Sequence, residues 1–317
     1  MQEWSKYPET PSRIGLLLFD KFSNLCLANC LEPLRAANTL TEKEGFSWQI
    51  LTPDSLPSRS SSGIEVLPHT ALSKLPKVDF LFVLASYDHD GHDTAATRRM
   101  LRDAARKAEV VVGLDAGPWL LASAGLLQGR RATVHWDLLE PFTERFLDIE
   151  VARARVMRDG PFWTCAGAMS ALDLTLDLIA DTLGISARLD VEALFLHGDP
   201  PLRPDEMREE DDPLVQQALS LMRETVEMPL DLVSLAKALS CQPRTLDRRC
   251  RARLGAPPGT VYRHLRLSAA RKLLEGGRLP ISEIALRCGY ENPAALARAM
   301  RKHYGASPSE LRRNARA

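Results

Sequence analysis

Hydrophobic and polar positions follow two alternating periods over the first 180 or so residues. Short apolar runs, typical of buried strands, lie at 13–20, 47–54, 64–68 and 79–85. Between them, LANCLEPLRAANTL (27–40) and TAATRRMLRDAARKA (94–108) carry apolar residues at helical spacing. Alternating strands and helices of this kind predict an α/β sandwich around a mostly parallel sheet.

The pattern changes towards the carboxyl terminus. Between Leu189 and Asp212 the chain is rich in proline and acidic residues and has no period, which predicts a linker. After Pro213 it is almost wholly helical and contains two similar units, each a short helix, a turn and a basic second helix. We therefore expect a first domain over 12–188, a linker over 189–213 and a helical domain over 214–317, with its two units at about 232–253 and 281–303.

Charge is distributed unevenly along the 317 residues, although the formal net charge is zero. From Gln216 onward there are 19 basic and 8 acidic residues, a balance of +11, and the remainder has a balance of −11. A strongly basic segment of this kind favours contact with a polyanion. A helical bundle with a solvated basic surface remains the alternative on charge alone.

The first helical unit has the pattern of a helix-turn-helix. Leu232, Leu235 and Leu239 are spaced to bury one face, Ser240–Gln242 form the turn, and Pro243 suits the first position of the next helix. Leu246 and Cys250 are expected to face inward. The outward residues, which we predict to contact DNA, are Arg244, Thr245, Arg248, Arg249 and Arg251. The first three lie where a recognition helix meets base edges, and the last two are expected on phosphates.

The second unit repeats this pattern about 50 residues later. Ile281, Ile284 and Cys288 are expected to pack, and Gly289 permits the tight turn. The predicted DNA-contacting residues here are Asn292, Ala294, Ala295, Arg298, Arg301 and Lys302. Because the two alanines offer no hydrogen-bonding groups, base specificity is expected to rest more on the first unit and on DNA shape.

The last 100 or so residues resemble the AraC-family DNA-binding domain, which holds two helix-turn-helix units joined by a long helix. The most specific segment is ISEIALRCGYENPAALARAMRKHYGASPSELRR (281–313). Leu296, Met300, Leu311 and Cys250 stand where the family usually has aromatic residues, which keeps these positions apolar. The resemblance implies a transcription regulator, with activation the expected mode and RNA polymerase a possible partner.

One turn of the first domain has the sequence pattern of a strand-to-helix turn that carries a catalytic nucleophile. VVVGLDAGPW (110–119) reads as a buried strand, a sharp turn and the start of a helix, the geometry that presents a nucleophile in many hydrolases. A nucleophile at this position is usually a thiol or hydroxyl, and this turn carries Asp115.

The first domain resembles the class I glutamine amidotransferase-like, PfpI-type sandwich found in one AraC subfamily. The matching segments are EPLRAAN (32–38), 113–137 and 162–179. In enzymatic relatives the turn carries a cysteine, assisted by a histidine and sometimes by a glutamate of the first helix. Here Asp115 takes the cysteine's place and Glu32 the glutamate's. We therefore expect no catalysis; an active hydrolase or amidotransferase with an appended DNA-binding domain is the alternative.

The same turn is expected to bind a small effector instead. The resemblance implies that Glu32 and Asp115 lie side by side and form an acidic pocket, which would attract a cation. Trp119, His135 and Trp136 are expected around it, and aromatic faces beside carboxylates suit quaternary ammonium or guanidinium groups. Related regulators answer to glycine betaine, carnitine or arginine-type nutrients, so a cationic or zwitterionic effector is predicted. The alternatives are that these side chains are core and that the domain only dimerises.

The remaining features of the sequence predict no further binding or catalytic site. The group SYDHDGHD (86–93) is expected to be a solvated loop rather than a metal site, and no metal or cofactor is predicted. The six cysteines are scattered, which favours reduced thiols in a cytoplasm. No apolar run is long enough for a membrane helix, and the polar start has no signal-peptide core. The expected assembly is a cytoplasmic homodimer bound to double-stranded DNA.

Overall fold

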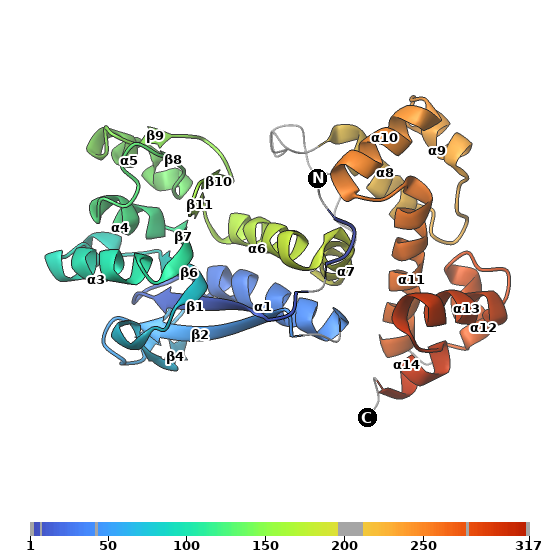
Figure 1. Cartoon of the computed structure of the whole chain (residues 1–317), viewed down its shortest axis with the longest axis horizontal. Helices are drawn as coiled ribbons and strands as arrows, with labels where there is room; N and C mark the ends of the chain where they lie inside the picture. Colours follow the sequence, from blue (N-terminus) through green and yellow to red (C-terminus); the bar gives the residue numbers. More distant parts are fainter. Residues whose placement is uncertain (1–2, 7, 42–43, 196–211, 277–278, 315–317) are drawn as a thin grey trace. The chain divides into compact units, whose positions relative to one another are not determined.

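The computed structural model describes residues 3–6, 8–41, 44–195, 212–276 and 279–314. They divide into two compact units, Tyr7–Thr182 and Met1–Lys6 with Leu183–Ala317. The first is an α/β unit and the second is built from helices (Figure 1).

The α/β unit is organised around one seven-stranded sheet with the order β10-β11-β7-β6-β1-β2-β5. All neighbouring strands are parallel except β10 and β11. The strands are β1 Ser12–Leu18, β2 Phe46–Thr52, β5 Thr70–Ala71, β6 Val78–Ala85, β7 Ala108–Asp115, β10 Val156–Asp159 and β11 Phe162–Cys165. The predicted α/β fold is confirmed, and the central strands β1, β6 and β7 are its most buried.

The apolar run at 64–68 does not join this sheet. Its residues form β4 (Glu65–Val66), which pairs with β3 (Ser58–Arg59) as a separate antiparallel ribbon. Ile64 and Leu67 are 50% and 73% exposed, so this run lacks the burial that holds the central strands. A second small ribbon pairs β8 (Arg131–Ala132) with β9 (Glu150–Val151).

Helices cover the sheet at the predicted places. Thr94 caps α3 (Ala95–Ala105) by accepting a hydrogen bond from the Thr97 backbone N–H. In Figure 1, α1 and α6 lie beside each other, and Asn29 Nδ2 donates to Ala168 O at 2.8 Å between them. The helices of the unit are α1 Asn24–Thr41, α2 His89–His92, α3, α4 Gly117–Ser123, α5 Leu139–Arg145 and α6 Ala168–Leu183, with 3₁₀ turns at Leu72–Lys74 and Trp136–Leu138.

The helical unit begins earlier than the sequence pattern indicated. Positions 189–195, predicted as linker, belong to α7 (Ile185–Phe195), and residues 196–211 lie outside the described residues. The other helices are α8 Pro213–Glu224, α9 Leu232–Ala238, α10 Pro243–Leu254, α11 Pro258–Gly276, α12 Ile281–Arg287, α13 Pro293–Tyr304 and α14 Pro308–Asn314. Within the described ranges, no helix is long and apolar enough to cross a bilayer.

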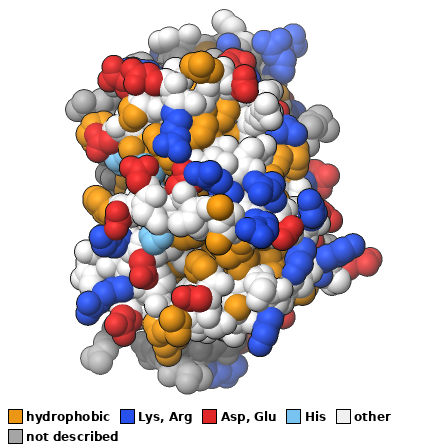
Figure 2. All heavy atoms as spheres, turned by 90° about the vertical axis from the view of Figure 1, so that its left-hand side faces the viewer, with side chains coloured by type: hydrophobic (Ala, Val, Ile, Leu, Met, Phe, Trp, Pro, Cys, Tyr) orange, Lys and Arg blue, Asp and Glu red, His pale blue; other side chains and the backbone are white. Residues whose placement is uncertain are grey.

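Figure 2 shows the end of the molecule that carries α3 and α5. Basic and acidic side chains are interspersed there around hydrophobic surfaces, and neither sign forms a continuous field. This face of the α/β unit therefore lacks the single-sign surface typical of nucleic-acid contact.

Candidate functional site

Asp115 occupies the strand-to-helix turn in a left-handed backbone conformation, with φ 62°. The turn is held by the Ala116 N–H, which donates to Ala85 O at 2.8 Å. A Cβ on Gly117 would lie 2.1 Å from Val83 O, so only glycine fits at this position. The geometry expected of a nucleophile's turn is confirmed, with a carboxylate at its tip and conformational strain of the kind found at functional sites.

The Asp115 side chain is buried and has a neutral hydrogen-bond donor. Its Oδ2 accepts from Ser86 Oγ at 2.7 Å, and Ser86 Oγ accepts in turn from the Ser23 N–H at 2.8 Å. Burial raises the pKa of Asp115, although Ser86 and the nearby imidazoles of His135 and His89 oppose that rise. Ionisation therefore costs free energy here, and a bound cation would offset that cost.

Glu32 is not brought to Asp115. Its side chain is half exposed and pairs with Arg35 Nε at 2.8 Å on the outer side of α1. The helix turns Cys26 and Cys30 inward instead, and Cys26 lies close enough to Asp115 for the two to interact electrostatically. The expected pair of carboxylates is therefore absent from the described contacts, because α1 begins at Asn24 and its phase places Glu32 outside.

Three thiols lie beneath the turn. Cys26, Cys30 and Cys165 are each fully buried, as packing residues would be. The neighbouring Cys30 and burial raise the pKa of Cys26 well above its ordinary value, and burial raises the pKa of Cys165 to about 12. Thiolates are the reactive form of cysteine, so Cys26 and Cys165 are poor nucleophiles at neutral pH.

The tryptophans Trp119, Trp136 and Trp163 have different surroundings. Trp119 is 5% exposed, meets the His89 ring edge-on at 4.9 Å, and its Nε1 has no hydrogen-bond partner among the described residues. Trp136 is 69% exposed, with its ring 5.4 Å from that of His135. Trp163 lies against Arg158 and Phe80. Trp136 and His135 are therefore the accessible pair near the turn.

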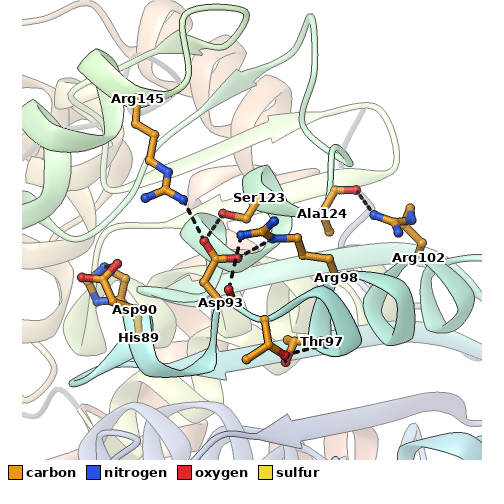
Figure 3. Close-up of polar contacts among 10 residues, drawn as sticks. His89, Asp90, Asp93, Thr97, Arg98, Arg102, Ser123, Ala124 and Arg145 are labelled. Atoms are coloured by element: carbon orange, nitrogen blue, oxygen red, sulfur yellow. Dashed lines mark hydrogen bonds and ion pairs between the residues drawn. The ribbon is translucent and has the colours of Figure 1, made fainter.

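The segment 86–93 is more ordered than a solvated loop. Asp93 is nearly buried and accepts hydrogen bonds from Arg98 Nε at 2.7 Å, Ser123 Oγ at 2.8 Å and an Arg145 nitrogen at 3.0 Å (Figure 3). The interpretation as a solvated loop is wrong for Asp93 and for His89, which packs on Trp119. The part of the chain that the structure describes contains no group of three metal-binding side chains.

The first helix-turn-helix forms as the pattern predicted. Ser240 takes a left-handed conformation in the turn between α9 and α10, and Leu246 and Cys250 are buried. Exposure of the predicted DNA-contacting residues is high for Arg244, Arg248, Arg249 and Arg251 and intermediate for Thr245. Two of these arginines already have partners: Arg249 pairs with Asp212 at 3.1 Å and Arg251 with Asp247 at 2.8 Å.

The second helix-turn-helix uses Gly289 at the corresponding turn position, with φ 71°. A Cβ there would lie 2.7 Å from Val226 O, so glycine is required. Asn292 caps α13, because its Oδ1 accepts from the Ala295 N–H at 2.9 Å. This capping role was not predicted. Ala295 is half-buried. The other residues predicted to contact DNA are exposed: Ala294, Arg298, Arg301 and Lys302.

A buried ion pair fastens α7 to the long helix α11. His264 is 2% exposed, and its Nε2 lies 3.1 Å from both Asp190 Oδ1 and Ser186 O. His264 Nδ1 lies 3.1 Å from His303 Nε2 of α13. The sequence pattern did not single out these residues, since they meet only in the folded unit.

Both parts of the chain match known protein families. Residues 12–181 match the model of the DJ-1/PfpI family, and residues 235–314 match a helix-turn-helix domain. The chain is 34% identical over 303 residues to the HTH-type transcriptional regulator CdhR of Pseudomonas aeruginosa, covering 93% of this chain and 90% of that protein.

Two further relatives match a little over half of this chain. An isonitrile hydratase of Pseudomonas putida is 30% identical over 177 residues, which cover 55% of this chain and 73% of that enzyme. The crystal structure of an AraC family transcriptional regulator from Pseudomonas putida superposes with a TM-score of 0.52 at 23% identity, over 58% of this chain and 99% of that one. This structural likeness concerns the fold.

Proposed function

Because the chain belongs to the AraC-type helix-turn-helix transcription regulators with an amino-terminal DJ-1/PfpI domain, and is a DNA-binding regulator, we propose that this domain is a non-catalytic sensor. It binds a small cationic or zwitterionic nitrogen compound at the Asp115 turn. Occupancy of that turn changes the affinity of the helix-turn-helix units for DNA.

The described residues at the turn support binding over catalysis. The turn that would present a thiol or hydroxyl carries Asp115, and the nearby Cys165 has a pKa of about 12. The hydroxyl of Ser86 is already held between the Ser23 N–H and the Asp115 carboxylate. Likeness to an isonitrile hydratase over part of the chain therefore does not by itself imply catalysis, because one fold can carry unrelated functions.

The single observation that carries the proposal is the buried Asp115 carboxylate with a neutral hydrogen-bond donor. A cationic ligand would lower the cost of keeping this carboxylate ionised. The exposed ring of Trp136 beside His135 offers an aromatic face for a quaternary ammonium or guanidinium group. Asp115, His135 and Trp136 therefore form the proposed effector site. Glu32 lies outside it, and Trp119 is a buried side chain that packs on His89.

For DNA, we propose that α10 and α13 enter neighbouring segments of the major groove. Arg244 and Arg248 are exposed on the first half of α10, where side chains meet base edges. Arg298, Arg301 and Lys302 are exposed on α13 and are assigned to phosphates, which makes binding salt-dependent. The sensor domain is proposed to dimerise and the regulator to activate transcription.

Isothermal titration calorimetry tests the sensor directly. Glycine betaine, carnitine and L-arginine are titrated into the full-length protein, into Asp115→Asn and into the control Asp103→Asn, whose carboxylate is exposed on α3. We expect at least one compound to bind the wild type and the control equally, and Asp115→Asn about tenfold or more weakly, since a charge-assisted contact is lost. Absence of heat from all three compounds, or equal affinity for Asp115→Asn, contradicts the proposal.

A further inference from the structure

Arg249 of α10 has a guanidinium that is held on one side and open on the other. Its Nη1 donates to Asp212 Oδ1 at 3.1 Å, and its other nitrogens make no hydrogen bond among the described residues. The Arg249 side chain is 44% exposed, whereas that of Asp212 is 11% exposed. The carboxylate therefore lies behind the guanidinium, and the remaining nitrogens of Arg249 can donate to a ligand.

Asp212 is fixed independently of Arg249. It is the N-cap of α8, and its Oδ1 also accepts from the Leu214 N–H at 3.0 Å and the Val215 N–H at 3.4 Å. The positive end of the helix dipole favours a negative charge at this position. Because the carboxylate has a fixed place at the start of α8, its ion pair orients the flexible arginine side chain before any ligand arrives.

The helix that carries Asp212 is itself held along its length. The buried residues of α8 are Val215, Ala218, Leu219 and Met222. Towards its other end, Arg223 Nη2 pairs with Glu192 Oε2 of α7 at 3.1 Å, and the Glu192 side chain is only 13% exposed. The anchor of Arg249 therefore belongs to a packed part of the helical unit, as the support of a functional side chain should.

The second helix-turn-helix lacks this arrangement. Arg249 is the sixth residue after Pro243, the first residue of α10, and the sixth residue after Pro293 of α13 is Ala299. Ala299 is half-buried and packs against the hydrophobic core of the second unit. The first unit therefore presents an anchored cation where the second presents a methyl group.

A phosphate of the DNA backbone is the group that this geometry fits. A guanidinium carries five N–H donors in a planar fork, so one edge can bind a carboxylate while another binds phosphate oxygens. Asp212 engages only one nitrogen of Arg249, so an incoming phosphate need not displace it. Arginine–phosphate hydrogen bonds are charge-assisted and depend strongly on orientation.

We propose that Asp212 is a positioning residue for DNA binding, which orients the Arg249 guanidinium towards a backbone phosphate. The inference rests on the proposed placement of α10 in the major groove and makes it more specific. Arg249 then contributes affinity that is independent of base sequence, whereas Arg248 is assigned to base edges.

A double-mutant cycle on the full-length protein tests this role. The variants are Asp212→Ser, Arg249→Ala and their combination. Serine caps a helix as well as aspartate does, so Asp212→Ser keeps the cap of α8 and removes the charge and the reach of the side chain. The matched control is Asp231→Ser, because Asp231 caps α9 through the Ser234 N–H and pairs with no cation in the described part of the chain.

Fluorescence anisotropy measures the affinity of each variant for a mixed-sequence DNA duplex at several salt concentrations, and thermal melting confirms that each variant is folded. We expect Arg249→Ala to weaken binding by roughly threefold to tenfold and to reduce the slope of log affinity against log salt by about one, since one phosphate contact is lost. In the presence of Asp212→Ser, the further effect of Arg249→Ala should fall below about twofold. In the presence of Asp231→Ser it should keep its full size.

Three results would overturn the proposal. An effect of Arg249→Ala that is equally large with and without Asp212→Ser shows that the two residues act independently. A larger effect in the presence of Asp212→Ser shows that Asp212 competes with DNA for the guanidinium. No effect of Arg249→Ala in the otherwise wild-type protein shows that Arg249 does not contact DNA.

Arg248→Ala separates these failures from a failure of the proposed DNA interface. If Arg248→Ala weakens binding to DNA from upstream of the neighbouring genes while the cycle fails, α10 still lies in the major groove and only the role of Asp212 is refuted. If Arg248→Ala and Arg249→Ala both leave DNA binding unchanged, the proposed placement of α10 fails as well.

Discussion

Two buried aspartates, one in each unit of the protein, show how differently a carboxylate can be accommodated. Asp190 of α7 lies 3.1 Å from the imidazole of His264. Burial raises the pKa of Asp190, but His264 outweighs it and the pKa is lowered overall. Asp115 of the α/β unit accepts a hydrogen bond from the neutral Ser86, and burial raises its pKa.

These two environments distinguish a carboxylate that stabilises the fold from one that can bind a ligand. A buried carboxylate beside a cationic imidazole completes the packing of helices, and removing one partner leaves an uncompensated charge. A buried carboxylate whose direct hydrogen-bond donor is neutral, placed on a strained turn, adds a cost that folding alone does not require. We therefore assign Asp190 to the stability of the helical unit, and the proposed role of Asp115 is ligand binding.

The largest expected effect is on stability. Asp190→Asn leaves the His264 charge buried without its partner, so we expect the helical unit to lose about 3–5 kcal/mol of unfolding free energy. Asp115→Asn should change the unfolding free energy of the α/β unit by much less, because it removes no ion pair. Urea unfolding, followed separately for the two units, measures both variants. Similar losses of unfolding free energy in the two variants would contradict the different roles of the two aspartates.

A smaller expected effect is the pH dependence of the stability of the helical unit. Burial lowers the pKa of His264, but Asp190 outweighs it and the pKa is raised above its ordinary value of about 6.5. The pair therefore stabilises the helical unit fully below about pH 6.5, and this contribution is lost as the pH rises through the folded-state pKa. The lowered pKa of Asp190 adds stability that is present above about pH 3.8 and is lost on acidification through its folded-state pKa.

Urea unfolding between pH 6 and pH 9 checks this dependence. The wild type should lose stability over the alkaline part of that range, and His264→Gln, which has no imidazole to titrate, should show a flatter profile. The same loss in both proteins would show that His264 is not the titrating group.

Local sequence signals were sufficient for the central strands, the turn and the helix-turn-helix units. The run of valines before Gly113, the glycine after Asp115 and the proline at the start of each second helix act within a few residues of themselves. Contacts between distant elements gave no such signal. Asp93 meets Arg145 across 52 positions, and Asp190 meets His264 only after α7 and α11 pack.

Glu32 shows a second limit of sequence-based prediction. The resemblance placed its helix correctly, but the rotation of α1 about its own axis decides which residues face Asp115. Cys26 and Cys30 are four positions apart and both buried, so they mark the inner face of this helix. Weighing that apolar pair against the acidic residue would have directed Glu32 outward.

We propose that ligand binding at Asp115 changes the DNA affinity of the helix-turn-helix units. One measurement tests this directly. Fluorescence anisotropy measures the affinity of the full-length protein for DNA from upstream of its neighbouring genes, with and without the compound that calorimetry identifies. Arg248→Ala serves as a control that should weaken DNA binding by about 1–3 kcal/mol and keep effector affinity. The wild type should change its DNA affinity when the effector is added, and Asp115→Asn should bind DNA equally with and without it. A full effector response in Asp115→Asn would contradict the account.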